Sequence, residues 1–332
     1  MAHFDLPLDK LHSYRPDLSV PDDLQSFWER TLAEARGHDL ALRVEQIDNR
    51  LTLVDTYDLT FAGFDGSPVR GWLHVPAGTT EALPTVATYK GYSGGRGFPH
   101  ADNVYVLAGY AQLVLDTRGQ SYGGGGWEVT PDTPRGAAPN HVPGQMTRGI
   151  LDPENYYYRR VYTDALRLLD VAAALPQCDT GRLAVAGGSQ GGGITIAVAG
   201  LAALTGIELV GSAPDVPFLC DFPRATTLVN TLPYEEIARY LKAFRDHVEP
   251  AFWTLSYFDG AILGRWATAP TSFSVGLMDT TCPPSTCFAA YNWYGDGHVT
   301  DRDMQVYSFN GHEGGGDYRK QQLLDWLKPR LA

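Results

Sequence analysis

The sequence predicts an α/β fold, in which a mostly parallel central sheet carries helices on both faces and a helical insertion lies near its carboxyl edge. Strand and helix patterns alternate through most of the chain, and this alternation implies crossover units that join parallel strands. Several strand patterns are short apolar runs, as expected for strands buried on both faces. A chain of 332 residues with 44% apolar composition is long enough to form such a core.

An amphipathic helix is expected near the N-terminus, on the outside of the molecule. It begins at Asp22 or Asp23 and ends at Gly37, which are residue types that start and stop helices. Between them, apolar residues recur at helical spacing: Leu24, Phe27, Trp28, Leu32 and Ala35.

The remaining elements follow in chain order. Strands are expected over 52–60, 69–76, 84–89, 110–116, 183–186, 207–213, 271–277 and 304–309, and helices over 157–175, 193–204, 284–293 and 318–331. The first two strands indicate an antiparallel opening. Antiparallel strands followed by parallel ones is the order of the α/β-hydrolase fold.

We expect one α/β-hydrolase domain over residues 1–332, with an N-terminal helical extension (about 1–40) and an insertion (about 215–265). The insertion interrupts the alternation with short helices over the carboxyl edge of the sheet. Its aromatic residues predict either core packing or a sugar-facing wall: Phe218, Tyr234, Trp253 and Tyr257. The glycine-rich and proline-rich stretch between 116 and 156 is longer than ordinary connections, which is typical of functional or disordered loops.

The charge of the chain excludes several partners. Lys and Arg number 26 against 38 Asp and Glu, which gives a formal net charge of −12. This balance disfavours nucleic acid and anionic lipid surfaces. The sequence starts without a basic region followed by an apolar run, and no stretch reaches 18 apolar residues. We therefore expect no membrane contact and a cytoplasmic location.

Four scattered cysteines do not form a disulfide framework or the paired spacing of a zinc site: Cys178, Cys220, Cys282 and Cys287. We expect free buried thiols. A bridge between Cys282 and Cys287 is the alternative.

The segment GGSQGGG, from Gly187 to Gly193, predicts a nucleophile elbow. An apolar strand pattern precedes it and an Ala-rich helix pattern follows it, which is the context that G-x-S-x-G requires. Gly187 and Gly191 would let strand and helix approach closely while Ser189 holds its hydroxyl toward a substrate. A purely structural turn is the alternative. A nucleotide-binding loop is disfavoured because neither a P-loop lysine nor the G-x-G-x-x-G spacing is present.

A serine nucleophile needs a histidine base and an acid that orients the histidine. Asp279 and His312 follow Ser189 in the order serine, acid, histidine, and each comes directly after a strand pattern. Asp279 alternatively only caps the helix that follows it. A zinc motif at His312 would need a second histidine where Gly316 stands.

The oxyanion of an acyl-transfer reaction needs two backbone donors. The N–H of Gln190, directly after the nucleophile, is expected to be one. Tyr92, in the glycine-rich loop after the third strand, is expected to supply the other donor, and Gly91 is the alternative. The loop could instead be a purely structural turn.

Together these residues resemble carbohydrate esterase family seven, the acetyl xylan esterases and cephalosporin C deacetylases. Three family motifs appear in order: Arg118-Gly119-Gln120, Gly187-Gly188-Ser189-Gln190-Gly191 and His312-Glu313. The regions around Asp279 and Tyr156 are also similar, and the resemblance runs through almost the whole chain. One departure is Lys90, since the family usually has histidine before Gly-Tyr.

The resemblance implies deacetylation of small acetylated sugars and related acetate esters through Ser189, Asp279 and His312. It implies that Arg118 and Gln120 hold the oxyanion loop, that no metal or organic cofactor is needed, and that the chain forms a homo-hexamer. Two rivals remain. One is a hydrolase of the same fold that prefers longer acyl groups or amides, and the other is a non-catalytic binding protein.

Overall fold

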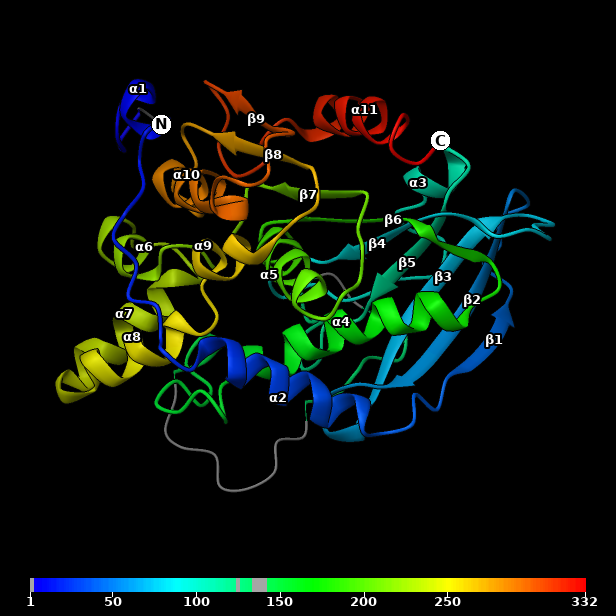
Figure 1. The fold of residues 1–332 in the computed structure, drawn as a ribbon, viewed down its shortest axis with the longest axis horizontal. Helices are drawn as coiled ribbons and strands as arrows, with labels where there is room; N and C mark the ends of the chain where they lie inside the picture. The colour runs from blue at the N-terminus through cyan, green and yellow to red at the C-terminus, as the bar shows by residue number, and fades with distance from the viewer. Residues whose placement is uncertain (1–2, 124–125, 133–141) are drawn as a thin grey trace.

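The computed structural model describes residues 3–123, 126–132 and 142–332, and within them nine strands form one sheet (Figure 1). The strand order is β1-β2-β3-β5-β4-β6-β7-β8-β9. The pairs β1–β2, β2–β3 and β3–β5 are antiparallel, and every later pair is parallel. The predicted antiparallel opening and mostly parallel sheet are therefore confirmed. Part of the predicted loop over 116–156 lies outside the described residues.

The strands are β1 (Arg43–Ile47), β2 (Val54–Ala62), β3 (Pro68–Pro76), β4 (Leu83–Tyr89), β5 (Ala111–Leu115), β6 (Cys178–Gly188), β7 (Gly211–Asp215), β8 (Thr271–Gly276) and β9 (Arg302–Tyr307). The α-helices are α1 (Leu8–Leu11), α2 (Leu24–Arg36), α3 (Val104–Leu107), α4 (Tyr157–Ala174), α5 (Gln190–Leu204), α6 (Phe222–Leu228), α7 (Tyr234–Ala243), α8 (Val248–Ser256), α9 (Gly260–Leu263), α10 (Pro284–Trp293) and α11 (Gly316–Leu327).

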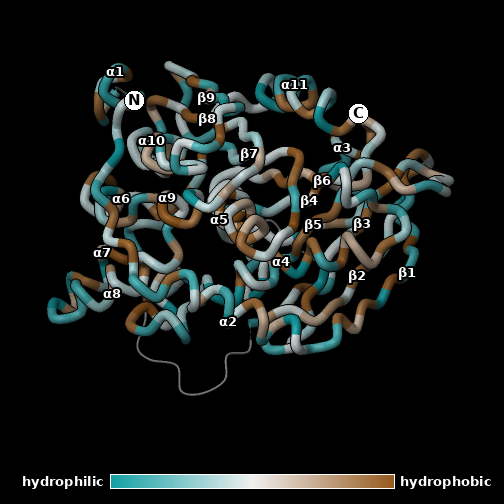
Figure 2. Tube along the Cα trace, viewed as in Figure 1, coloured by the Kyte–Doolittle hydropathy of each residue, from teal (hydrophilic) through white to brown (hydrophobic). Residues whose placement is uncertain are grey.

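Helices cover both faces of the sheet because alternate side chains of each strand point to opposite sides. In β4, Ala87 belongs to the large core beneath α4 and α5, whereas its neighbour Val86 packs with Leu323 and Leu327 of α11. Figure 2 shows hydrophobic colour concentrated in α5 and the central strands. α5 is buried from Gln190 to Ala202, as the Ala-rich sequence predicts.

The predicted helix after Asp23 is confirmed as α2, and Gly37 is its C-cap. Several predicted boundaries differ from the observed ones, and two of them bear on the site. The strand expected over 207–213 begins at Gly211, since Ile207 N–H donates to the carbonyl of Ala202 and closes the end of α5. Helix α5 begins at Gln190 rather than at 193, so its first turn contains three glycines. Strand β1 was not predicted, because its side chains are mostly exposed and show no apolar alternation.

Helices α6 to α9 occupy the segment expected as an insertion (Figure 1). Three of its four candidate aromatics are buried in the core: Phe218, Tyr234 and Tyr257. Trp253 is the exception, with 49% of its surface exposed. The insertion's aromatic side chains therefore serve mainly as core, and the domain organisation stays a prediction.

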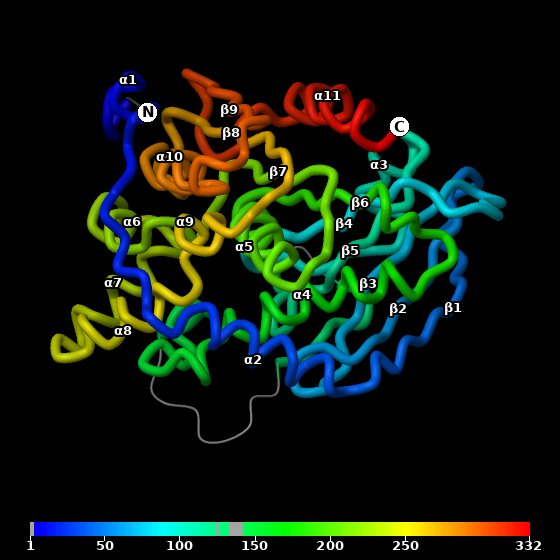
Figure 3. The backbone as a smooth tube through the Cα atoms, in the orientation of Figure 1, coloured from blue at the N-terminus to red at the C-terminus, as the bar shows by residue number. Residues whose placement is uncertain are grey.

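The N-terminal segment passes beside α10 and α6 before it enters α2, as Figure 3 shows. Asn292 of α10 donates to the carbonyls of Leu11 and Tyr14, at 3.0 and 2.8 Å. The Tyr14 hydroxyl donates to Asp221 at 2.9 Å. These bonds tie the segment to the elements that surround the candidate site.

Candidate active site

Ser189 lies in a sharp turn between β6 and α5, with φ 56° and ψ −120°. A non-glycine residue in such a conformation costs of order 1–3 kcal/mol and persists only where its surroundings hold it. Here Ser189 N–H donates to the carbonyl of Asp215, and its carbonyl accepts from Phe218 N–H, both at 2.9 Å. The strain and the bonds that maintain it are those expected of a nucleophile elbow.

Gly187 and Gly191 are required by close packing around this turn. A Cβ atom on Gly191 would lie 2.1 Å from the carbonyl oxygen of Tyr89. A Cβ on Gly187 would lie 2.5 Å from the backbone of Gly191. Only glycine lets α5 start so close to β4 and β6, so these residues determine where Ser189 stands.

The structure brings Asp279 and His312 to Ser189. His312 Nδ1 lies 2.8 Å from Asp279 Oδ2, and His312 Nε2 lies 2.9 Å from Ser189 Oγ. An ionised Asp279 can only accept, so it favours the tautomer in which Nδ1 carries the proton and Nε2 accepts from the serine hydroxyl. Asp279 is fully buried, whereas the His312 side chain is 35% exposed.

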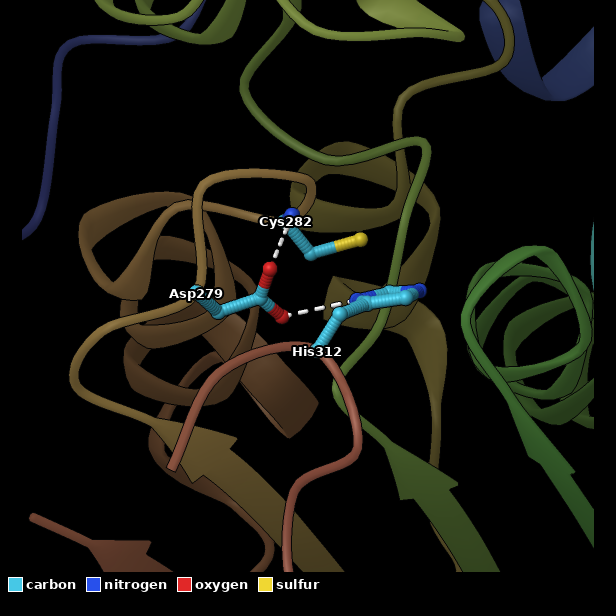
Figure 4. A group of neighbouring side chains, drawn as sticks. All are labelled: Asp279, Cys282 and His312. Atoms are coloured by element: carbon cyan, nitrogen blue, oxygen red, sulfur yellow. Dashed lines mark hydrogen bonds and ion pairs between the residues drawn. The ribbon is translucent and has the colours of Figure 1, made fainter. Parts of the chain in front are cut away.

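The loop after β8 holds Asp279 through its other oxygen. Asp279 Oδ1 accepts from Thr281 N–H at 2.7 Å. It also accepts from Cys282 N–H at 2.9 Å, the bond drawn in Figure 4. Asp279 does not cap α10, whose N-cap is Pro283 with no side-chain cap bond. The alternative of a helix cap is therefore wrong: one carboxylate oxygen holds the loop and the other contacts His312.

Glu313 shapes the loop that carries His312. Its Oε1 accepts from the Asn310 side chain and from Gly311 N–H at 3.0 and 3.1 Å. Backbone N–H groups, its own and that of Gly311, lower the pKa of the Glu313 carboxyl. Gly316, where a zinc motif would need histidine, is the first residue of α11.

Gln120 connects the two loops that would hold the oxyanion donors. Its Oε1 accepts from Ser93 N–H at 2.7 Å, beside Tyr92. Its Nε2 donates to Gln190 Oε1 at 2.8 Å and to the Tyr157 hydroxyl at 3.0 Å. Tyr92 and Gln190 are thus linked through one buried amide. Gln190 is the first residue of α5, so its backbone N–H has no acceptor within the helix.

Two basic residues of the motif regions are paired with acids away from Ser189. Arg118 forms a buried bidentate pair with Asp164 of α4, at 2.5 and 2.7 Å, and its carbonyl accepts from the Tyr157 hydroxyl. Lys90 donates to Asp102. Arg118 therefore fixes its loop to α4, and among the described contacts it does not touch the loop around Tyr92.

No motif or spacing pointed to Glu236 of α7. This carboxylate is 4% exposed and accepts from the Tyr92 hydroxyl at 2.8 and 3.0 Å and from Met146 N–H at 3.0 Å. Burial raises the pKa of Glu236 and also that of Tyr92. Glu236 thereby attaches the helices over 222–263 to the loop that carries the expected oxyanion donor.

All four cysteines are buried and free. The alternative of a bridge between Cys282 and Cys287 is wrong, because the Cys287 thiol instead contacts the carbonyl oxygens of Pro217 and Cys282. Cys282 lies beside Asp279 and His312, a proximity that cysteine spacing alone could not reveal.

Within the described part of the chain, no helix combines the length and the apolar character that a membrane crossing demands.

A strained serine between a parallel strand and a helix, with histidine and aspartate after two later strands, defines an α/β-hydrolase. The family model for acetyl xylan esterase (AXE1) matches residues 1–330. The chain therefore belongs to the acetyl xylan esterase family and is a carboxylic ester hydrolase. The resemblance found in the sequence is confirmed.

Individual relatives agree with this assignment. The chain is 37% identical to an acetyl xylan esterase from Paenibacillus sp. R4, covering 98% of this chain and 99% of that one with a TM-score of 0.88. It is 32% identical to acetyl xylan esterase 1 from Thermoanaerobacterium sp. JW/SL YS485, covering 97% and 99% with a TM-score of 0.85. It is also 24% identical to acetyl esterase Axe7A of Xylanibacter ruminicola, over 96% of this chain and 69% of that protein.

Proposed function

We propose that the protein is a serine esterase that removes acetyl groups from small acetylated carbohydrates such as xylooligosaccharides, and from related acetate esters such as cephalosporin C. The observation that carries the proposal is the continuous chain of contacts from Ser189 through His312 to Asp279, at 2.9 and 2.8 Å, in a member of the acetyl xylan esterase family.

The proposed reaction uses these three side chains as nucleophile, base and orienting acid. His312 Nε2 takes the Ser189 proton while the oxygen attacks the acetyl carbonyl. Asp279 stabilises the imidazolium, which then gives its proton to the leaving alcohol. Water repeats the sequence on the acyl-enzyme and releases acetate.

The N–H groups of Tyr92 and Gln190 are the proposed oxyanion donors. A Cβ on Gly91 would lie 3.9 Å from the Cβ of Ser189, so the loop runs directly beside the nucleophile. Gln120 holds both donors in register through Ser93 and the Gln190 side chain. Fixed donors need no reorganisation when charge develops, which is the source of their contribution to the rate.

The test compares hydrolysis of acetyl, butyryl and longer nitrophenyl esters by the wild type and by Ser189→Ala. We expect a steep loss of kcat/KM beyond acetyl, and a fall of about 10⁴-fold or more in kcat for the variant. Ser256→Ala is the matched control, because this buried serine of α8 donates to the carbonyl of Trp253, three positions earlier in the same helix.

Each rival gives a different result. A preference for long acyl groups or amides would replace the deacetylase proposal with another hydrolase. Wild-type rates in Ser189→Ala would refute the nucleophile. A non-catalytic protein would not be labelled at Ser189 by a serine-directed phosphonate. The homo-hexamer and the cytoplasmic location stay predictions.

A further inference from the structure

We propose that Asp279, Cys282 and His312 form an inhibitory binding site for a thiophilic divalent cation of the zinc and cadmium type. The ion would occupy the candidate active site and block it, and no part of the reaction proposed above uses it. Loss of activity on binding rests on the proposed function, but the binding itself does not.

The first support is the geometry of the cluster. One ligand atom from each of the three side chains lies within 4.8 Å of the other two. Figure 4 shows the Cys282 sulfur and the His312 ring on the same side of the Asp279 carboxylate. Ligand bonds to zinc of about 2.0–2.3 Å place tetrahedral ligands roughly 3–4 Å apart, so side-chain movements of about 1 Å suffice to close the site.

The second support is the set of donor atoms. Sulfur, imidazole nitrogen and one carboxylate oxygen suit zinc and its heavier relative cadmium, whereas magnesium and calcium require mainly oxygen ligands. An ionised Asp279 and a Cys282 thiolate together neutralise the two charges of the ion. A neutral cluster avoids the cost of burying net charge.

The surroundings already hold the ligands in place. Asp279 and Cys282 belong to one short loop, which is fixed because Asp279 Oδ1 accepts from Cys282 N–H at 2.9 Å. Hydrogen bonds of this kind around metal ligands raise affinity. The 35% exposed His312 side chain gives the ion a route from solvent.

Binding exchanges a proton for the metal. Burial raises the pKa of the Cys282 thiol, so the metal-free protein holds it protonated. The ion displaces this proton to solvent as the sulfur–metal bond forms, with no change of oxidation state. The ion binds His312 through Nδ1, the nitrogen that faces Asp279, and replaces the hydrogen bond between the two side chains. The Nδ1 proton passes to Nε2, so the histidine can no longer accept the Ser189 proton and loses its function as the proposed base.

The test titrates the full chain with cadmium chloride and records two signals, the ultraviolet charge-transfer band of a cadmium–thiolate bond and hydrolysis of an acetyl nitrophenyl ester. We expect saturation at one ion per chain, parallel loss of activity, and recovery with a chelator. In Cys282→Ala, both signals should need at least about tenfold more cadmium, because removal even of an outer partner of a metal ligand costs 10–100-fold in affinity. Cys178→Ala is the control, since Cys178 is buried at the opposite end of β6 from Ser189.

Several results would overturn the site. These are no charge-transfer band in the wild type, the same cadmium dependence in Cys282→Ala, or an equal change in Cys178→Ala. The wild-type titration alone decides the matter if Cys282→Ala does not fold. A cadmium band that depends on Cys282 in a protein without esterase activity would support the site and refute the proposed function.

Discussion

Replacing Glu236 by Gln tests whether helix α7 controls the proposed oxyanion donor. The Glu236 carboxylate accepts from the Tyr92 hydroxyl at 2.8 and 3.0 Å and from Met146 N–H at 3.0 Å. Both carboxylate oxygens therefore face donors. Glutamine has the same size but is neutral, so the bonds from Tyr92 and Met146 lose their charged acceptor.

The magnitude follows from these contacts. A hydrogen bond to a charged group contributes about 1.5–3 kcal/mol. A bond to a neutral acceptor still contributes about 0.5–1.5 kcal/mol. If the difference of about 1–1.5 kcal/mol holds the Tyr92 loop in position, its loss lowers kcat by about five- to tenfold. The upper bound is the loss of an oxyanion donor, about 2.7–4 kcal/mol.

The assay measures kcat and KM for an acetyl ester with Glu236→Gln, Tyr92→Phe and the double variant. Because the donor acts on the transition state, kcat should fall while KM changes little. The two single changes disrupt the same contact, so their effects should not add. Glu235→Gln is the matched control on the same helix, since Glu235 pairs with the exposed Arg239.

Additive effects of Glu236→Gln and Tyr92→Phe would refute the coupling between the two residues. An unchanged kcat with raised KM would assign Glu236 to substrate binding instead.

Two further predictions concern stability. Gly191→Ala should lower the free energy of unfolding by about 3 kcal/mol or more, because its Cβ would lie 2.1 Å from the carbonyl oxygen of Tyr89. Urea unfolding measures this loss. The control Gly188→Ala should lose much less, since its Cβ would meet nothing closer than 4.0 Å. Burial lowers the pKa of His74 to about 3, so the folded state binds this proton less readily than the unfolded state and stability falls as pH drops below about 6.5. Between pH 6.5 and 5 the wild type should lose about 1.5 kcal/mol more than His74→Gln, and equal losses would contradict this assignment.

The sequence predicted the parts of the molecule that local patterns determine. The helix at 284–293 has the predicted bounds, and a proline marks its start. The strand before Ser189 and the helix after it were also recognised. The early start of α5 was missed, because glycine ordinarily disfavours a helix. Here the close approach of Tyr89 to Gly191 overrides that preference.

Contacts between distant segments could not be predicted in the same way. Glu236 meets Tyr92 across 144 positions of sequence, and neither residue type signals the other. The fixed position of Cys282 beside His312 likewise depends on how the loops after β8 and β9 turn at the sheet edge. Such contacts arise from tertiary packing, so motifs identified the three proposed catalytic residues but not the groups that surround them.

The sheet itself explains why residues so far apart in sequence meet. Strands β6, β7, β8 and β9 are consecutive and parallel, so their carboxyl ends share one edge. Ser189, Asp279 and His312 each follow one of these strands, and the distance between them is set by strand spacing rather than by chain length. Segments inserted between the strands can therefore vary without moving the three side chains. An insertion that contacts the site, as α7 does through Glu236, can shift the loop around Tyr92 while Ser189, Asp279 and His312 keep their positions.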